Sequence, residues 1–230
     1  MQMEIRRSHD RGHANHGWLN SRHTFSFANY YDPRFMGFGP LRVINEDTVE
    51  PARGFGTHPH RDMEIISYVV AGQLGHKDTM GTGSVIVPGD VQLMSAGTGV
   101  AHSEMNPSDD ESVHFLQIWI QPSELRTRPR YEQKSFPRTW DGVQLVVSQD
   151  GREGSLTIGQ DIDLYRVLLR QGQSAAQTMA RHRGWVQLIK GQLEVNGALL
   201  MAGDGLAIVD ADAVTFKANE DVEALFFDMI

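Results

Sequence analysis

The 230-residue sequence contains no cysteine. This absence excludes disulfide bonds, thiol nucleophiles, iron–sulfur clusters and thiolate metal sites. Any bound metal would therefore need ligands from histidine, aspartate, glutamate or backbone oxygen. The sequence also has no apolar run of about 18 residues, and its first residues, MQMEIRRSHD, lack the apolar stretch of a secretion signal. We therefore expect a cytoplasmic protein that does not bind membranes.

Basic residues are in the minority, with 21 Lys and Arg against 29 Asp and Glu, which gives a formal net charge of −8. A net anion gains no electrostatic energy by approaching a phosphate backbone, so we expect no direct nucleic-acid binding. Hydrophobic residues make up 40% of the chain and charged residues 22%, as in ordinary globular proteins. The length is comfortable for two small domains.

Short apolar runs bounded by Gly, Pro, Asp and Asn recur along the chain, and no long stretch has a clean helical period. They share the length and composition of β-strands. Examples of these runs are Ile65–Val70, Val85–Val87, Val91–Met94, Val113–Ile120, Gln144–Val147, Trp185–Ile189, Leu193–Val195, Leu206–Val209 and Ala224–Phe227. The pattern predicts an all-β protein built as a barrel or a sandwich. The run VHFLQIWI suits a strand that is buried on both faces.

A weak internal repeat indicates two similar β domains. YVVAG at Tyr68–Gly72 is followed by PGDVQLM, and LIKG at Leu188–Gly191 is followed by AGDGLAI. The order of strand, Gly turn, strand and x-Gly-Asp therefore occurs twice. The polar stretch at 121–142 between them favours a linker or extended arm. We place the domains at 1–130 and 131–230.

Seven of the ten histidines show no pattern that favours metal binding. Four of them lie early in the chain, namely His9, His13, His16 and His23. We expect these four on polar surface or in hydrogen-bonded turns. His76, in GHKDTMG, is predicted at a hairpin tip with a structural role, and His182 is predicted to be solvated. His114 lies inside a predicted strand and stays unassigned.

Two short pairs have the spacing of metal ligands. His58 and His60 form HPH, and His102 and Glu104 lie in AGTGVAHSE. On a strand, residues i and i+2 point to the same face with Cβ atoms roughly 7 Å apart, so each pair could reach one ion. Three imidazoles and one carboxylate suit a divalent first-row metal. The alternative is four unrelated polar residues at strand ends, since HPH alone arises readily by chance in a histidine-rich chain.

Longer segments around these pairs resemble the pirin family. GFGTHPHRDMEIISYVVAG and PGDVQLMSAGTGVAHSE are similar to the metal-binding half of a pirin. RGHANHGWLNSRHTFSFANYYDP is similar to the amino-terminal segment of pirins, and RYEQKSF to their inter-domain arm. The chain resembles the bacterial pirin-like proteins that are described as quercetin 2,3-dioxygenases. The resemblance implies a bicupin, with two tandem jelly-roll barrels and a metal in the first.

The same resemblance implies the ligand set and the metal. The implied ligands are His58, His60, His102 and Glu104. The metal is one divalent transition ion, with iron(II) expected first and nickel, manganese, cobalt, copper or zinc as alternatives. Most cupins instead take the glutamate of H-x-H-x3-4-E, which here is Glu64. Strand parity puts Glu64 on the side of the two HPH histidines, so it remains a rival that the pirin resemblance disfavours.

The second half of the chain lacks the ligand residues. Aligning the repeats puts the five positions of interest on Gln177, Met179, Arg183, Phe216 and Ala218. None of these is a histidine or a carboxylate. We therefore predict that the second barrel holds no metal and is structural.

The activity implied by the resemblance is oxygenolytic cleavage of a flavonol such as quercetin, with loss of carbon monoxide. The partners would then be a small aromatic substrate and dioxygen. Glu104, or Glu64 if it is not a ligand, would take the substrate proton. The alternative is a metal- or redox-sensing regulatory protein that binds other proteins, because pirins are also known as regulators. We expect a monomer, because two fused barrels can cover each other's sheet edges.

Overall fold

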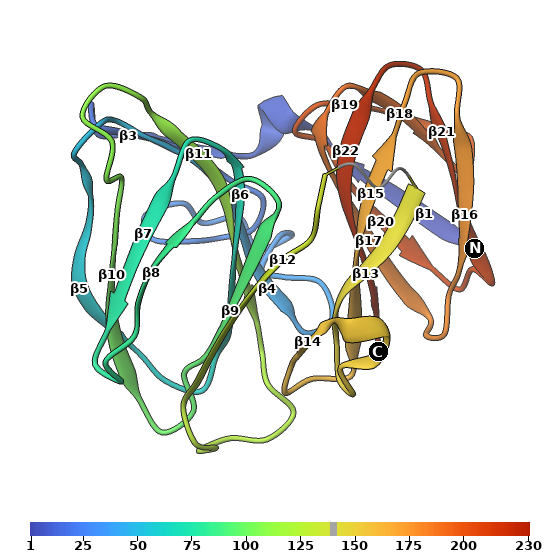
Figure 1. The fold of residues 1–230 in the computed structure, drawn as a ribbon. Coiled ribbons are helices and arrows are strands. Elements are labelled where there is room, and N and C mark those ends of the chain that lie inside the picture. Colours follow the sequence, from blue (N-terminus) through green and yellow to red (C-terminus); the bar gives the residue numbers. More distant parts are fainter. Residues whose placement is uncertain (139–141) are drawn as a thin grey trace. The chain divides into compact units, whose positions relative to one another are not determined.

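The computed structural model describes residues 1–138 and 142–230, and this part of the chain consists almost entirely of β-strands and their connections (Figure 1). Its helical segments are two single 3₁₀ turns, η1 (Ser8–Asp10) and η2 (Arg152–Gly154). Among the described residues, no helix has the length and apolar character that crossing a membrane requires. The predicted all-β class is therefore confirmed.

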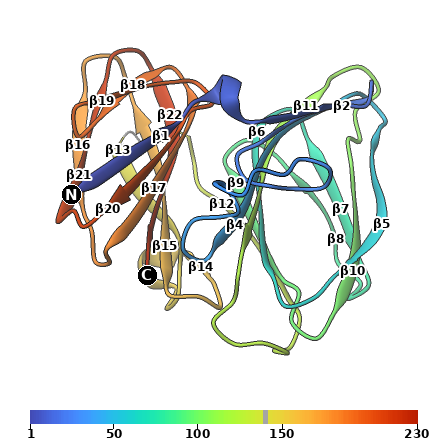
Figure 2. The same cartoon turned by 180° about the vertical axis from the view of Figure 1, so that it is seen from behind.

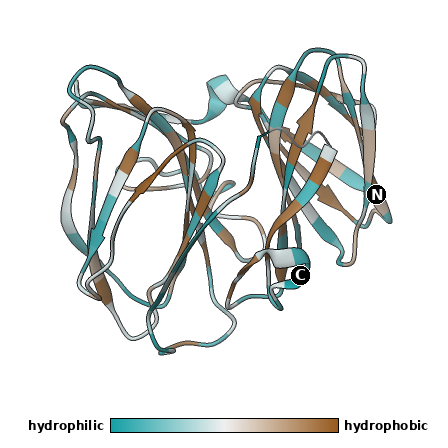
Figure 3. Ribbon diagram, viewed as in Figure 1, coloured by the Kyte–Doolittle hydropathy of each residue, from teal (hydrophilic) through white to brown (hydrophobic). Residues whose placement is uncertain are grey.

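The contacts within the chain define two units. The first barrel comprises Gly12–Pro137 with Ile158–Gln160, and the second comprises Met1–Arg11, Arg138–Thr157 and Asp161–Ile230. Each unit has one seven-stranded and one four-stranded sheet, as expected for a jelly-roll barrel. Apolar stretches lie on the strands of both units (Figure 3).

The first barrel contains eleven of the strands. They are β2 (Gly12–Asn15), β3 (Leu19–His23), β4 (Leu41–Val49), β5 (Gly54–His60), β6 (Glu64–Ala71), β7 (Leu74–Asp78), β8 (Gly83–Ile86), β9 (Asp90–Ser95), β10 (Val100–Met105), β11 (Val113–Ile120) and β12 (Arg130–Ser135). The large sheet has the order β12-β9-β6-β11-β4-β3-β2, and the small sheet has the order β5-β10-β7-β8. All the pairings in these two sheets are antiparallel.

The second barrel contains the other eleven strands. They are β1 (Gln2–Arg6), β13 (Gly142–Ser148), β14 (Leu156–Thr157), β15 (Ile162–Leu169), β16 (Ser174–Thr178), β17 (Arg183–Lys190), β18 (Gln192–Val195), β19 (Ala198–Met201), β20 (Gly205–Val209), β21 (Ala213–Ala218) and β22 (Val222–Met229). The sheets have the orders β1-β20-β17-β22-β15-β13-β14 and β16-β21-β18-β19. Apolar side chains fill the interior, and Met179, Phe216 and Ala218 are among them.

Two segments lie in units that differ from the predicted boundaries of 1–130 and 131–230. β1 adds to the edge of β20, from Gln2 opposite Val209 to Arg6 opposite Gly205, so the chain's start belongs to the second barrel (Figure 2). The polar stretch predicted as a linker at 121–142 contains β12, which pairs with β9 in the first barrel. Residues 139–141 of that stretch lie outside the described part of the chain.

The apolar runs were good predictors of strands. All nine predicted runs fall in strands, with Val87 one residue beyond the end of β8. The residues of β11 are all buried or half-buried, which confirms that this strand is covered on both faces. β4, with the sequence LRVINEDTV, was not among the predicted runs because it alternates apolar residues with charged and amide side chains. Two of those polar residues, Asn45 and Asp47, line the cavity described below.

Candidate metal centre

Three of the predicted ligands lie together where β5 pairs with β10. In this antiparallel pair His58 is opposite His102, and His60 is opposite Val100. One ring nitrogen of each of the three histidines lies within 4.8 Å of the others, and the ring centroids are 4.5 to 4.8 Å apart. The i, i+2 spacing of HPH and the strand register therefore converge three imidazoles on one point.

A β-bulge in β5 helps to orient the first histidine. The register shifts between His102 and Glu104, because β5 has one extra residue at Gly56–Thr57. Nδ1 of His58 lies 2.8 Å from the carbonyl oxygen of Gly56. The carbonyl can only accept, so Nδ1 carries the proton and Nε2 of His58 keeps its lone pair for a metal.

The other two histidines have the state that a metal ligand needs. Burial, followed by the nearby charge of His58, lowers the pKa of His60 to about 4. Burial, followed by the charges of the neighbouring histidines, lowers the pKa of His102 to about 3. Both rings are therefore neutral at pH 7. Nε2 of each is buried without a hydrogen-bond partner in the described structure, and such orphaned lone pairs fit a divalent metal ion.

His76 contacts His102 of the cluster. Sequence reasoning did not predict this contact. His76 lies inside β7, opposite Glu104, so the predicted hairpin-tip position is wrong. Its Nε2 is 2.9 Å from Oδ2 of Asp78, so Nε2 donates and Nδ1 is left to accept. Nδ1 of His102 lies 3.4 Å from this Nδ1, and Nε2 of Gln92 lies 3.3 Å from it. With Nδ1 of His76 as the acceptor, the 3.4 Å contact assigns the proton of His102 to Nδ1, which leaves its Nε2 unprotonated.

Asp78 is itself held firmly. Its side chain is fully buried, as is that of His76. Its Oδ1 accepts hydrogen bonds from the backbone amides of Met80 and Thr82, at 2.9 and 3.0 Å. Burial acts to raise the pKa of Asp78, but the hydrogen bonds from His76 and the two amides outweigh it and hold the pKa below its usual value. A fixed carboxylate thus orders His76, and His76 orders His102.

Glu104, the predicted fourth ligand, lies two residues after His102 and is 3% exposed. Its Oε1 accepts a hydrogen bond of 3.2 Å from the hydroxyl of Ser67. Burial raises its pKa to about 7, with the negative charge of Asp47 adding to the effect and the Ser67 bond opposing it. In the described residues, the group of donor atoms within 4.8 Å comprises the three imidazoles and does not include this carboxylate.

Glu64, the predicted rival, does not point to the histidines. β5 ends at His60, and a turn that contains Asp62 at φ 49° separates it from β6. Strand parity therefore does not carry across this turn. On β6, Ser67 contacts Glu104, so Glu64 lies on the opposite face by alternation. There its Oε2 accepts a 2.7 Å hydrogen bond from Ser95, and burial raises its pKa.

A row of polar side chains crosses five strands of the large sheet on the side that faces Glu104. In the register of β3, β4, β11, β6 and β9 the row is His23, Asn45, Gln117, Ser67 and Gln92. The Ser67 hydroxyl is also 3.0 Å from Oε1 of Gln117, while Gln92 reaches His76. The row supplies hydrogen-bond partners to the buried polar groups of the site. It depends on long-range pairing and has no local sequence signal.

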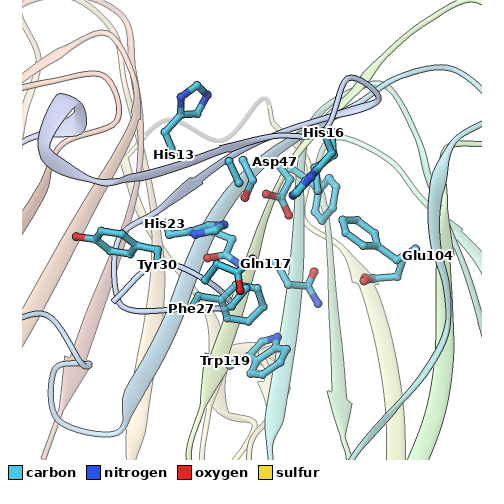
Figure 4. Close-up of a pocket in the computed structure, with 17 residues that line it drawn as sticks. His13, His16, His23, Phe27, Tyr30, Asp47, Glu104, Gln117 and Trp119 are labelled. Carbon is cyan, nitrogen blue, oxygen red and sulfur yellow. The ribbon is translucent and has the colours of Figure 1, made fainter. Parts of the chain in front are cut away.

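A cavity of about 420 Å³ lies inside the first barrel, and Glu104 is part of its wall whereas His58, His60 and His102 are not. Aromatic rings and polar side chains both line it (Figure 4). The aromatic lining residues include Phe27, Phe55, Phe115 and Trp119, and the polar ones include Asn45, Asp47, Glu104 and Gln117. Trp119 joins the cavity to the cluster, because its ring centroid is 4.9 Å from that of His60.

The early histidines contribute to the wall of this cavity. His13, His16 and His23 all line it, on the segment that contains β2 and β3. His13 is exposed and within 2.9 Å of Asn20, as expected for a hydrogen-bonded surface residue. His23 is 5% exposed and packs on Phe27, so its prediction as polar surface is wrong. His114 lies on the other face of β11, with Nε2 3.0 Å from Glu46.

The two halves of the chain match two family models. Residues 4–120 match the model described as Pirin, and residues 145–229 match the model described as Quercetinase C-terminal cupin domain. Apart from residues 4–11, which belong to the second barrel, these matches follow the division into two barrels.

Comparison with known proteins gives the same relationship. A curated Escherichia coli (strain K12) protein named quercetin 2,3-dioxygenase is 53% identical over 226 residues, which cover 98% of this chain and 97% of that protein. A pirin-like protein of Caulobacter vibrioides is 40% identical over 94% of this chain and 95% of its own length.

A solved structure shares the fold along its whole length. The crystal structure of the E. coli bacterial pirin YhhW in complex with nickel(II) has a TM-score of 0.95, with 50% identity and 99% of both chains covered. Sequence, family models and fold agree, so the chain belongs to the pirin family of two-domain cupin proteins.

Proposed function

We propose that this chain is a metal-dependent dioxygenase that cleaves a flavonol such as quercetin, acting in the cytoplasm. One divalent ion, with iron(II) as the first expectation, would be held by His58, His60, His102 and Glu104. The relatives named quercetin 2,3-dioxygenase and the nickel(II) complex of a relative support the reaction class and the presence of a metal.

The observation that carries the proposal is an aromatic cavity next to the histidine cluster, whose wall contains Glu104 and Trp119. Trp119 touches His60 and also lines the cavity. The volume of about 420 Å³ lies within the range of roughly 300–1,000 Å³ that is usual for small-molecule sites. A redox-sensing protein needs no such cavity, so its presence favours an enzyme over the regulatory alternative.

The protein's own groups prepare the site for this reaction. His60 and His102 are neutral at pH 7 and offer free Nε2 lone pairs. When bound, the metal ion would acidify a substrate hydroxyl and hold substrate and dioxygen near each other. Glu104, ionised as a ligand of the metal, would take the hydroxyl proton. The aromatic walls would pack on the ring faces of the substrate and exclude water.

Oxygen uptake with quercetin tests the proposal. Protein loaded with Fe(II), or with Ni(II), Mn(II) or Co(II), should consume dioxygen and release carbon monoxide when quercetin is added. His58→Ala and His102→Ala should abolish both metal binding and uptake, whereas His114→Ala, which changes a histidine bonded to Glu46 outside the site, should retain both. Absence of uptake by protein shown by elemental analysis to carry its metal would overturn the proposal.

A further inference from the structure

Two buried acceptors in the cavity wall have no partner in the described structure. They are Oδ1 of Asn45 and Oδ1 of Asp47, in side chains that are 4% and 5% exposed. The side chain of Asp47 is bonded by Ser21, so one carboxylate oxygen remains unused. An unpaired buried acceptor costs roughly 1–3 kcal/mol, so such atoms are normally satisfied. Both residues line the cavity, which is where a ligand would meet them.

The register of the sheet relates these acceptors to the metal cluster. Asn45 and Asp47 are i, i+2 on β4, so they share a face. They lie opposite Gln117 and Phe115 of β11. Trp119 lies two residues beyond Gln117 on the same face of β11, and its ring contacts His60. A flat ligand that begins at Glu104 and Trp119, next to the histidines, and follows this wall therefore reaches β4 with its other end.

The rest of the cavity indicates what kind of ligand fits. Phe27, Phe55 and Phe115 offer apolar surface for an aromatic ring. At β4 the unused atoms are both oxygens, and they accept hydrogen bonds when Asp47 is ionised. The missing partner is therefore a donor, and the hydroxyl groups of a phenol supply donors without adding positive charge.

We propose that Asn45 and Asp47 form a subsite that accepts hydrogen bonds from hydroxyl groups on a second ring of the substrate, the ring farther from the metal. The subsite rests on the proposed function, because it assumes that another part of the same molecule lies at the histidines. Within flavonols it selects those with a hydroxylated phenyl ring, such as the dihydroxyphenyl ring of quercetin. It would discriminate against a flavonol whose phenyl ring is bare.

Binding without turnover tests the subsite. Zinc(II)-loaded protein under anaerobic conditions is titrated with quercetin and, separately, with galangin, the flavonol that lacks both hydroxyls on the phenyl ring. Tryptophan fluorescence or calorimetry gives the dissociation constants. Burial raises the pKa of Asp47 to about 7, so the titrations are made at pH 8, where this carboxylate is ionised. We expect quercetin to bind about 10- to 100-fold more tightly, since hydrogen bonds to a charged acceptor have energies that correspond to such ratios.

Variants of Asn45 and Asp47 test whether these two residues cause the preference for quercetin over galangin. Replacing both acceptors, Asn45→Leu with Asp47→Leu, should bring the two dissociation constants within about threefold while galangin binding is kept. Glu46→Gln is the matched control, because Glu46 is on the same strand but bonds His114 on the opposite face. It should leave the preference unchanged.

The outcomes separate the two proposals. Equal binding of quercetin and galangin by the wild-type protein would overturn the subsite while leaving the oxygenase activity intact, and this comparison needs no variant to fold. A preference that survives in the folded double variant would also overturn it. If the metal-loaded wild-type protein binds neither flavonol, the proposed function fails, and the subsite fails with it.

Discussion

The side chain of His102 is prepared for a metal by a residue that does not itself join the cluster. Asp78 fixes His76, and His76 can only accept at Nδ1, so the proton of His102 is kept on the nitrogen away from the cluster. Partners of this kind fix the ring orientation of metal ligands and raise their basicity. The chain from carboxylate to imidazole to imidazole is thus part of the site.

His76→Phe should weaken metal binding by about 10- to 100-fold, because His102 loses the acceptor that sets its tautomer. A competition titration against a chelator of known affinity measures the change. In the cobalt(II)-loaded protein, the shifted N–H resonance of His102 should also move or disappear, which a purely structural role would not cause. His114→Phe is the control. A folded His76→Phe protein with wild-type affinity would refute the role.

Metal binding should release a proton from Glu104 at pH 6 and not at pH 8. Its pKa of about 7 means that the carboxyl is mainly protonated at pH 6, and a ligand must be ionised. Calorimetry in buffers with different ionisation enthalpies counts the released protons. Glu104→Gln should release about one proton fewer than wild type at pH 6 and bind metal more weakly at both pH values.

Glu64→Gln is the control for this measurement, because Glu64 bonds Ser95 on the opposite face of β6. It should leave both the proton count and the affinity unchanged. If Glu64→Gln weakens binding more than Glu104→Gln, the assignment of the fourth ligand must be reversed.

Local spacing was sufficient for part of the site. HPH placed His58 and His60 on one face, because i, i+2 on a strand depends only on local geometry, whereas their meeting with His102 depends on the pairing of β5 with β10. The ligand role of Glu104 stays a prediction. Glu64 was kept as a rival because parity was counted through the turn at Asp62, whose left-handed backbone resets the faces. Asn45 and Asp47 gave no signal, since charged and amide side chains in a strand ordinarily indicate a solvent-exposed face.

Among the strands, the close approach of β5 to β10 determines whether the histidines meet. A Cβ atom on Gly54 would lie 2.2 Å from the carbonyl oxygen of Glu104 and 2.6 Å from Cα of Met105. Only glycine therefore fits at this position. Gly56, two residues later at the bulge, has open space around its Cβ position. The two glycines form a natural pair for testing the importance of this contact.

Gly54→Ala should destabilise the protein by about 1–3 kcal/mol, because β5 must move away from β10. Metal affinity should fall as well, although no ligand is changed. Chemical denaturation and metal titration measure the two effects. Gly56→Ala should show neither effect. Equal behaviour of the two variants would mean that the close contact does not control the position of the cluster.

The strands that sequence reasoning found and missed differ in a simple physical way. The nine apolar runs are strands whose own side chains fill a core, so composition shows them. β15 also fills the core, but it is not among the nine because Asp163 and Arg166 interrupt its apolar residues. β4 was missed because it contributes polar residues to the cavity, and β1 because its pairing with β20 joins opposite ends of the chain. A local sequence pattern indicates neither that polar residues face a buried cavity nor that two distant segments pair. The division into two barrels was predictable from the repeat. The repeat did not indicate that residues 1–11 belong to the second barrel.

Across the chain as a whole, the histidines that could hold a metal lie in one of two similar barrels. Among the described residues, one group of metal-capable side chains is found, in the first barrel. In the second barrel Met179, Phe216 and Ala218, at three of the aligned positions, are part of the apolar core. The repeat has thus kept the fold in both halves while the interiors differ in polarity.

Purified protein should bind about one metal ion per chain, and binding should protect the first barrel alone. Ligand binding stabilises the structure that holds the ligand. Hydrogen exchange followed by mass spectrometry should therefore show slower exchange in peptides from β5, β7 and β10 on metal addition, with little change in β16 and β21. Two equivalents of metal, or equal protection of both barrels, would contradict this expectation.

The pairing of β1 with β20 has a consequence for how the chain is made. A ribosome adds roughly 5–20 residues each second, so the segment that completes the edge of this sheet waits roughly 10–40 s for its partner to be synthesised. The first barrel can fold during that interval, while β1 stays unpaired. A bulky fusion placed directly before β1 should then slow maturation of the second barrel, and a fusion placed after β22 should not.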